Sequence, residues 1–135
     1  NFTKAMNVAT YNSLNIQDID VGDLDNGGYY DDTVFPFSEV KTAAAQQHNS
    51  TVFILNSSGN EQYAIAVSSG SSAINVMDIS LGTVDSVAGN DIIVGLNGKV
   101  NAYNGSGYNL WNFIGGGSSN FPEIRFGNFS NNGIV

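Results

Sequence analysis

Hydrophobic and polar residues alternate in short runs along most of this chain, and clusters of Gly, Asn and Ser separate the runs. Runs that are rich in β-branched and aromatic residues and bounded by turn-forming residues are typical of antiparallel strands. The pattern therefore predicts an all-β domain. The predicted strands are residues 33–37, 51–55, 62–67, 91–96, 99–103 and 110–114.

One segment has a helical composition instead. Residues 39–48 read EVKTAAAQQH, with three alanines and two glutamines, which favour helix. We expect about two helical turns there, with His48 exposed at the end. His48 is the sole histidine, and no GxSxG motif accompanies it, so the sequence does not indicate a Ser/His/Asp arrangement.

Two predicted hairpins are similar in sequence. Residues 51–63 (TVFILNSSGNEQY) align with residues 99–111 (KVNAYNGSGYNLW) at an offset of 48. The alignment matches Asn56 with Asn104 and places the same Ser and Gly residues in both turns. Tight hairpins require these residue types, because some backbone dihedrals in them become positive.

The same alignment matches Tyr63 with Trp111, and turn chemistry does not account for a matched aromatic. In a strand, every second side chain lies on the same face. We therefore expect one buried face on each strand after the turn, with packing roles for both aromatics. The residues on these faces are Tyr63, Ile65 and Val67, and Trp111 and Phe113.

An acidic stretch at residues 21–34 reads VGDLDNGGYYDDTV. A calcium loop of the DxDxDG kind needs oxygen ligands on alternate residues and a glycine at its sharp turn. Gly28 fits the turn position, whereas Gly27 leaves the fifth ligand position to water or to Asn26. The candidate metal ligands are the carboxylates of Asp23, Asp25 and Asp31 and the carbonyl oxygen of Tyr29.

The acidic stretch is repeated in weaker form at residues 81–94 (LGTVDSVAGNDIIV) and 126–135 (FGNFSNNGIV). The first of these lies 59 residues from the acidic loop when Asp32 is matched with Asp91. The hairpins repeat at 48, so eleven inserted residues at 39–49 account for the difference. The predicted units are residues 19–67, with that insert, 75–114, and a partial unit at 123–135.

A period near 45 made of short strands is the signature of a β-propeller blade. The unit resembles FG-GAP-type repeats, whose acidic loop has the form GDxDGDGxxD. Its second half, NGKVNAYNGSGYNLWNF at residues 97–113, resembles the xGxVxAxNxxxGxxxW pattern of quinoprotein-like propeller repeats. The resemblance covers about two and a half repeats, and it implies structural Ca²⁺ at Asp23, Asp25 and Asp31.

The chain departs from this family in two respects. The second loop has Thr83 at the first ligand position, and the third has neutral Asn128, Ser130 and Asn132, so we expect hydrogen bonds alone to hold both. Propellers typically have four or more blades, and 135 residues supply fewer than three. The prediction is therefore propeller-blade-like repeats that are incomplete as a closed propeller, with a β-sandwich-like filament subunit as the alternative.

Composition narrows the classes of partner. The length of 135 residues indicates a single domain, and the net charge is −8 with only four basic residues. No basic patch could neutralise a phosphate backbone or an anionic membrane, so nucleic-acid binding is not expected. There is no cysteine for disulfides, and no apolar run reaches the ~20 residues that span a bilayer.

Five N-x-[ST] sequons occur, at Asn1, Asn49, Asn56, Asn104 and Asn128. Their glycosylation would imply an exported protein. The chain begins at Asn1 and not at Met, which suggests a processed or excised piece. Tyr29 and Tyr30 lie in the acidic turn, where we expect at least one to be exposed, and residues 115–119 (GGGSS) are expected to connect two units.

These observations favour a non-enzymatic, extracellular structural or adhesive surface protein, glycosylated and stabilised by calcium. Open sheet edges are sites where a strand from another chain can pair. The expected partners are therefore other copies of the chain, or other surface proteins and glycans, in a filament or layer. The alternative is a fragment of a larger β-propeller enzyme or ligand-binding sensor of the quinoprotein type.

Overall fold

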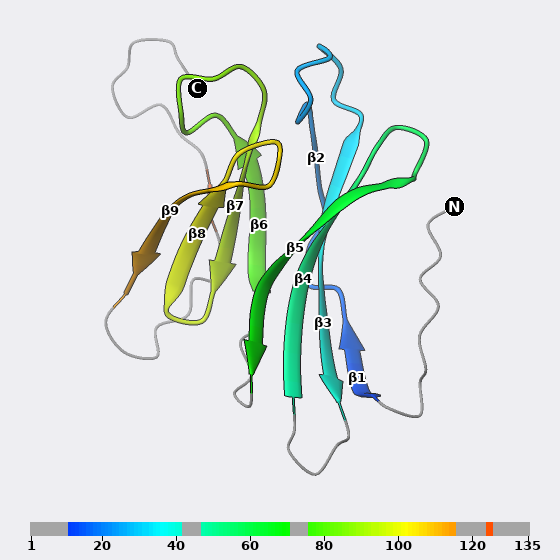
Figure 1. Cartoon of the computed structure of the whole chain (residues 1–135), viewed down its shortest axis with the longest axis vertical. Coiled ribbons are helices and arrows are strands. Elements are labelled where there is room, and N and C mark those ends of the chain that lie inside the picture. Colours follow the sequence, from blue (N-terminus) through cyan, green and yellow to red (C-terminus); the bar gives the residue numbers. More distant parts are fainter. Residues whose placement is uncertain (1–10, 42–46, 71–75, 116–123, 126–135) are drawn as a thin grey trace.

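The computed structural model describes residues 11–41, 47–70, 76–115 and 124–125, and within them the chain forms two antiparallel β-sheets and no helix (Figure 1). The all-β prediction is confirmed. No helix in this part of the chain is long and apolar enough to cross a membrane.

Each sheet is formed by consecutive strands. Sheet 1 has the order β1-β3-β4-β5, with β2 pairing beside β1 on the same side of β3, and sheet 2 has the order β6-β7-β8-β9. Sheet 1 comprises β1 (Tyr11–Asn15), β2 (Asp20–Gly22), β3 (Asp32–Lys41), β4 (Gln47–Leu55) and β5 (Glu61–Gly70); sheet 2 comprises β6 (Val76–Gly82), β7 (Asp91–Leu96), β8 (Lys99–Tyr103) and β9 (Asn109–Ile114).

The helix expected at residues 39–48 is wrong. Glu39 lies in β3 opposite Asn49 of β4, and Val40 lies opposite His48, so both ends of the segment are paired strands. Residues 42–46 lie outside the described residues, as does the side chain of His48. Helix propensity is a weak preference that tertiary pairing overrides, and here the β3–β4 ladder supplies that pairing.

A longer hairpin occupies the place of the eleven-residue insert. β3 and β4 have 10 and 9 residues, whereas β7 and β8 have 6 and 5. The connection between β3 and β4 is also longer, with five residues against two between β7 and β8. These differences in length add up to the eleven residues.

The two sheets share the same pairing register. Gly22 lies opposite Asp32 in sheet 1, as Gly82 lies opposite Asp91 in sheet 2. Further along, the ladder of β4 with β5 shifts register between Ile54 and Leu55, and the ladder of β8 with β9 shifts between Ala102 and Tyr103. These two shifts lie at matched positions of the hairpin alignment.

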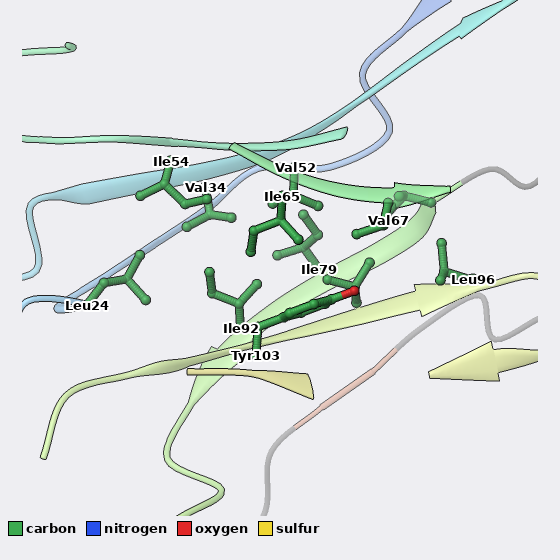
Figure 2. Close-up of a cluster of buried hydrophobic side chains, with 12 residues drawn as sticks. Leu24, Val34, Val52, Ile54, Ile65, Val67, Ile79, Ile92, Leu96 and Tyr103 are labelled. Carbon is green, nitrogen blue, oxygen red and sulfur yellow. The ribbon is translucent and has the colours of Figure 1, made fainter. Parts of the chain in front are cut away.

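The main core lies between the two sheets, and side chains from both point toward one another (Figure 2). Sheet 1 contributes β-branched and aliphatic side chains from the face that we call its front face. Sheet 2 contributes from the face that we call its back face. The cluster comprises Leu24, Val34, Val52, Ile54, Ile65, Val67, Val76, Ile79, Ile92, Val94, Leu96 and Tyr103, with Tyr63 and Leu81 packed against it.

A second cluster lies on the back face of sheet 1 and consists of Phe35, Phe53 and Leu55, with Phe37 packed against it. The rings of Phe35 and Phe53 stack with centroids 5.6 Å apart. The burial expected on the strand after each turn is confirmed for Ile65 and Val67 and wrong for the second hairpin. Trp111 and Phe113 are 42% and 55% exposed, because no described sheet covers the front face of sheet 2.

Candidate functional site

The acidic loop between β2 and β3 is held by its own backbone amides. Both carboxylate oxygens of Asp23 accept hydrogen bonds, from the N–H groups of Gly27 (2.8 Å) and Gly28 (2.9 Å). Asp25 accepts a second hydrogen bond from Gly27 at 2.8 Å. Gly28 has a φ of 82°, a left-handed conformation that glycine adopts without steric cost, which agrees with its predicted role at the turn.

The same loop is bonded to sheet 2. The N–H of Asp23 donates to Oδ1 of Asn90 (2.9 Å), and the N–H of Asn90 donates to the carbonyl of Asp23 (2.7 Å). Gly105, in the β8–β9 turn, lies so close to the carbonyl of Leu24 that any Cβ there would collide with it. The acidic loop therefore joins the two sheets at the end where their loops gather (Figure 1).

The candidate metal ligands do not form a cluster. Tyr29, Asp25 and Asp31 are exposed, and Tyr30 beside them is exposed as well, as expected for at least one of the tyrosines. Within the described residues, no group of three or more His, Cys, Asp or Glu side chains is arranged to hold a metal. Calcium binding at Asp23, Asp25, Tyr29 and Asp31 stays a prediction.

Two buried carboxylates hold the starts of the two loops. Asp32, only 1% exposed, accepts hydrogen bonds from the N–H of Leu24 (3.0 Å) and from Nε2 of Gln62 (2.9 Å). Asp91 accepts from the N–H groups of Val84 (2.7 Å) and Asp85 (3.2 Å). The sequence aligned these two acids without assigning them a role, and both stabilise a turn.

Two further acids connect β2 to β6. Oδ2 of Asp18 accepts a hydrogen bond from the N–H of Ile79 (3.0 Å), and Oδ2 of Asp20 accepts one from Leu81 (2.9 Å). β6 is an edge strand of sheet 2, so these N–H groups would otherwise lack an acceptor. Sequence analysis missed this pair, although acids at positions 18 and 20 fit the period of a strand.

Asp78 of β6 makes the corresponding contact with the next segment of the chain. Its Oδ2 accepts a hydrogen bond from the N–H of Ile124 and lies 3.9 Å from Nη1 of Arg125. Burial raises the pKa of Asp78, and the nearby Asp18 raises it further, while the Ile124 N–H and Arg125 oppose the rise.

Two tyrosines place hydroxyl groups between the sheets. The Tyr63 hydroxyl donates to the carbonyl of Gly105, and burial, followed by the charge of Asp32, raises the pKa of Tyr63 to about 12. Tyr103 accepts a hydrogen bond from Nδ2 of Asn101 at 3.0 Å, and burial raises its pKa as well. Oδ1 of Asn101 is buried without a hydrogen-bond partner among the described residues.

An apolar pocket of about 200 Å³ lies on the front face of sheet 2. Trp111 forms one side of it, and the pair of residues that follows the gap in the described chain forms another. The pocket contains no acid, so its lining offers no general acid or nucleophile. The lining residues are Val84, Ile93, Val100, Trp111, Ile124 and Arg125.

Three of the five sequons lie in the described residues. Asn56 and Asn104 occupy hairpin turns, where each side-chain oxygen accepts two backbone N–H groups at 2.9–3.1 Å. Asn49 differs, because it lies in β4 and its Nδ2 donates to Glu39 at 3.1 Å. Asn1 and Asn128 lie outside this part of the chain.

Comparison of the chain with protein-family models, with curated proteins and with solved structures gives no match. The FG-GAP and quinoprotein-like resemblance therefore stays a prediction that rests on the sequence motifs.

Proposed function

We propose that this chain is a non-enzymatic structural module of an extracellular or cell-surface protein. In this proposal, sheets 1 and 2 are two copies of one four-stranded unit, and the module assembles with other copies through its open sheet edge. The matched registers of the two sheets support the repeat relation. The use of Asp18, Asp20 and Asp32 as acceptors for backbone N–H groups supports a structural role for the acids.

The observation that carries the proposal is the composition of β9, which ends the strand order of sheet 2. Its sequence, NLWNFI, contains no charged residue. Trp111 and Ile114 on this strand are 42% and 79% exposed. Proteins usually protect an edge strand with charges, proline or a covering segment, because an unprotected edge pairs with other chains. β9 has the properties of a strand that forms an intermolecular sheet.

Light scattering over a concentration series tests this assembly. We expect the chain to form large species as its concentration rises. The substitution Asn112→Lys places a charge on exposed β9 and should keep the protein monomeric. Ser57→Lys adds the same charge at the exposed β4–β5 turn, away from this edge, and should assemble like the unsubstituted chain.

A monomeric mass at every concentration, or equal assembly of the two variants, would contradict the proposal. Electron microscopy of the assembled protein would then distinguish ordered filaments or layers, which the proposal expects, from amorphous aggregates, which also contradict it.

A further inference from the structure

The contact between β2 and β6 recurs one unit later. Asp18 lies four residues before Gly22, and Asp78 lies four residues before Gly82. Asp18 accepts the N–H of Ile79, and Asp78 accepts the N–H of Ile124. Residue 124 is therefore held beside sheet 2 in the way that β6 is held beside sheet 1.

The residues around these contacts also match. Residues 79–82 read ISLG and residues 124–127 read IRFG, so Phe126 corresponds to Leu81. Leu81 packs against the core on the front face of sheet 1, and its Cδ1 lies 2.8 Å from the position of a Cβ on Gly22. The correspondence places Phe126 against Gly82, on the front face of sheet 2.

That face has room for an apolar side chain. Its pocket of about 200 Å³ lies beside Trp111 and already includes Ile124 in its lining. Ile79, which matches Ile124, is almost fully buried against sheet 1. Because Asp78 anchors Ile124 here, the residues that follow it are present at high effective concentration, which favours them over any free partner.

We propose that residues 126–135 of this chain dock on the front face of sheet 2 and begin a third unit, with Phe126 in the pocket beside Trp111. This inference rests on the repeat relation in the proposed function, but not on assembly through β9. It turns an exposed aromatic face into the binding surface for the chain's own next segment.

Trp111 is the sole tryptophan, so its fluorescence reports on this pocket directly. In dilute, monomeric protein, we expect Phe126→Ser to shift the emission to longer wavelength and to increase quenching by acrylamide. Tyr29→Ser removes an exposed aromatic from the acidic loop and should change neither. An unchanged Trp111 signal in a folded Phe126→Ser variant would overturn the docking.

Cross-linking tests the position of Phe126 without relying on a destabilising variant, because the chain has no cysteine of its own. We expect Gly82→Cys with Phe126→Cys to form an intramolecular disulfide under mild oxidation, since disulfide Cβ atoms must approach to about 4 Å. Asn97→Cys with Phe126→Cys is the control, because Asn97 follows the far end of β7 from Gly82. Failure of the Gly82 pair to close, or equal closure of both pairs, overturns the inference.

The two proposals fail separately. Loss of the docking result leaves the light-scattering comparison of Asn112→Lys with Ser57→Lys unaffected, and a monomeric chain that closes the Gly82 disulfide would contradict only the assembly.

Discussion

Tyr63 connects the two sheets through a single side chain. It stands on β5 of sheet 1, packs against the main core, and donates its hydroxyl proton to the carbonyl of Gly105 in the β8–β9 turn. A Cβ added to Gly107 in that turn would lie 2.9 Å from the Tyr63 ring. Glycine at this position therefore lets the turn of sheet 2 approach the ring of sheet 1.

The substitution Tyr63→Phe keeps the ring and removes the hydrogen bond to Gly105. We expect it to lower the free energy of unfolding by about 1 kcal/mol, measured by urea denaturation at pH 8. Tyr108→Phe, at an exposed position in the same turn, is the matched control and should have no such effect. Equal stability of the two variants would show that the Tyr63 hydroxyl bond contributes nothing.

The raised pKa of Tyr63 gives this prediction a pH dependence. The folded state holds the phenol neutral up to about pH 12, whereas an unfolded tyrosine loses its proton near pH 10. The stability that this group contributes is therefore complete below pH 10 and is lost as the pH rises toward 12. The unsubstituted chain should lose more stability between pH 9 and 11 than Tyr63→Phe does.

Among individual residues, the sequence predicted those whose role follows from local turn chemistry. Gly28 was predicted as the turn residue because its position within the acidic motif requires a sharp bend. Asp18 and Asp20 were missed because their acceptor role depends on β6, about sixty residues away in sequence. A period of two in the chain shows which face an acid occupies, but not which strand lies opposite it.

At the scale of elements, β2 and β6 meet through side chains and not through a shared ladder. β2 pairs only with β3 among the described strands, and its acids reach across to the backbone of β6. Each of these acids also accepts the N–H of the residue that follows it, at 2.9 Å. The carboxylates are thereby fixed in orientation, and they close the edge of sheet 2 without merging the two sheets.

The substitution Asp20→Ala should weaken this joint. It leaves the N–H of Leu81 without its acceptor in a partly buried position, which we expect to cost about 1–3 kcal/mol. Glu61→Ala removes the same charge from an exposed position and is the control. Urea denaturation measures the stability, and amide exchange should be accelerated at Leu81 in the Asp20 variant. Equal loss in both variants would mean that charge alone, and not this bond, determines the result.

The strands that the sequence predicted are those with a strong apolar or alternating pattern. β7 and β8 have the predicted bounds, and β3, β4, β5 and β9 contain the predicted segments. β1, β2 and β6 were missed: β1 reads YNSLN and β2 reads DVG, and such short or polar segments become strands only through their pairing. The wrong helix has the same cause, since the β3–β4 ladder overrides the preference of its alanines.

At the scale of the whole molecule, negative charge is concentrated at one region. The net charge is −8, and residues 18–32 contain six of the twelve acids, which lie in β2, in the acidic loop and in the residues flanking them. Backbone amides satisfy Asp23, Asp25 and Asp32, but Coulomb repulsion among neighbouring carboxylates remains. A bound cation would relieve this repulsion, which is the physical basis of the calcium prediction.

The calcium prediction separates from general screening by a comparison of salts. If Asp23, Asp25 and Asp31 bind Ca²⁺, the melting temperature should rise more in millimolar CaCl₂ than in NaCl of equal ionic strength, because binding to the folded state alone stabilises it. EDTA should reverse the rise, and Asp31→Asn should abolish it. Asp85→Asn removes an acid from the corresponding second loop, where Thr83 replaces the first ligand, and should leave the rise intact. Equal melting temperatures in the two salts would show that backbone amides hold the acidic loop without a metal.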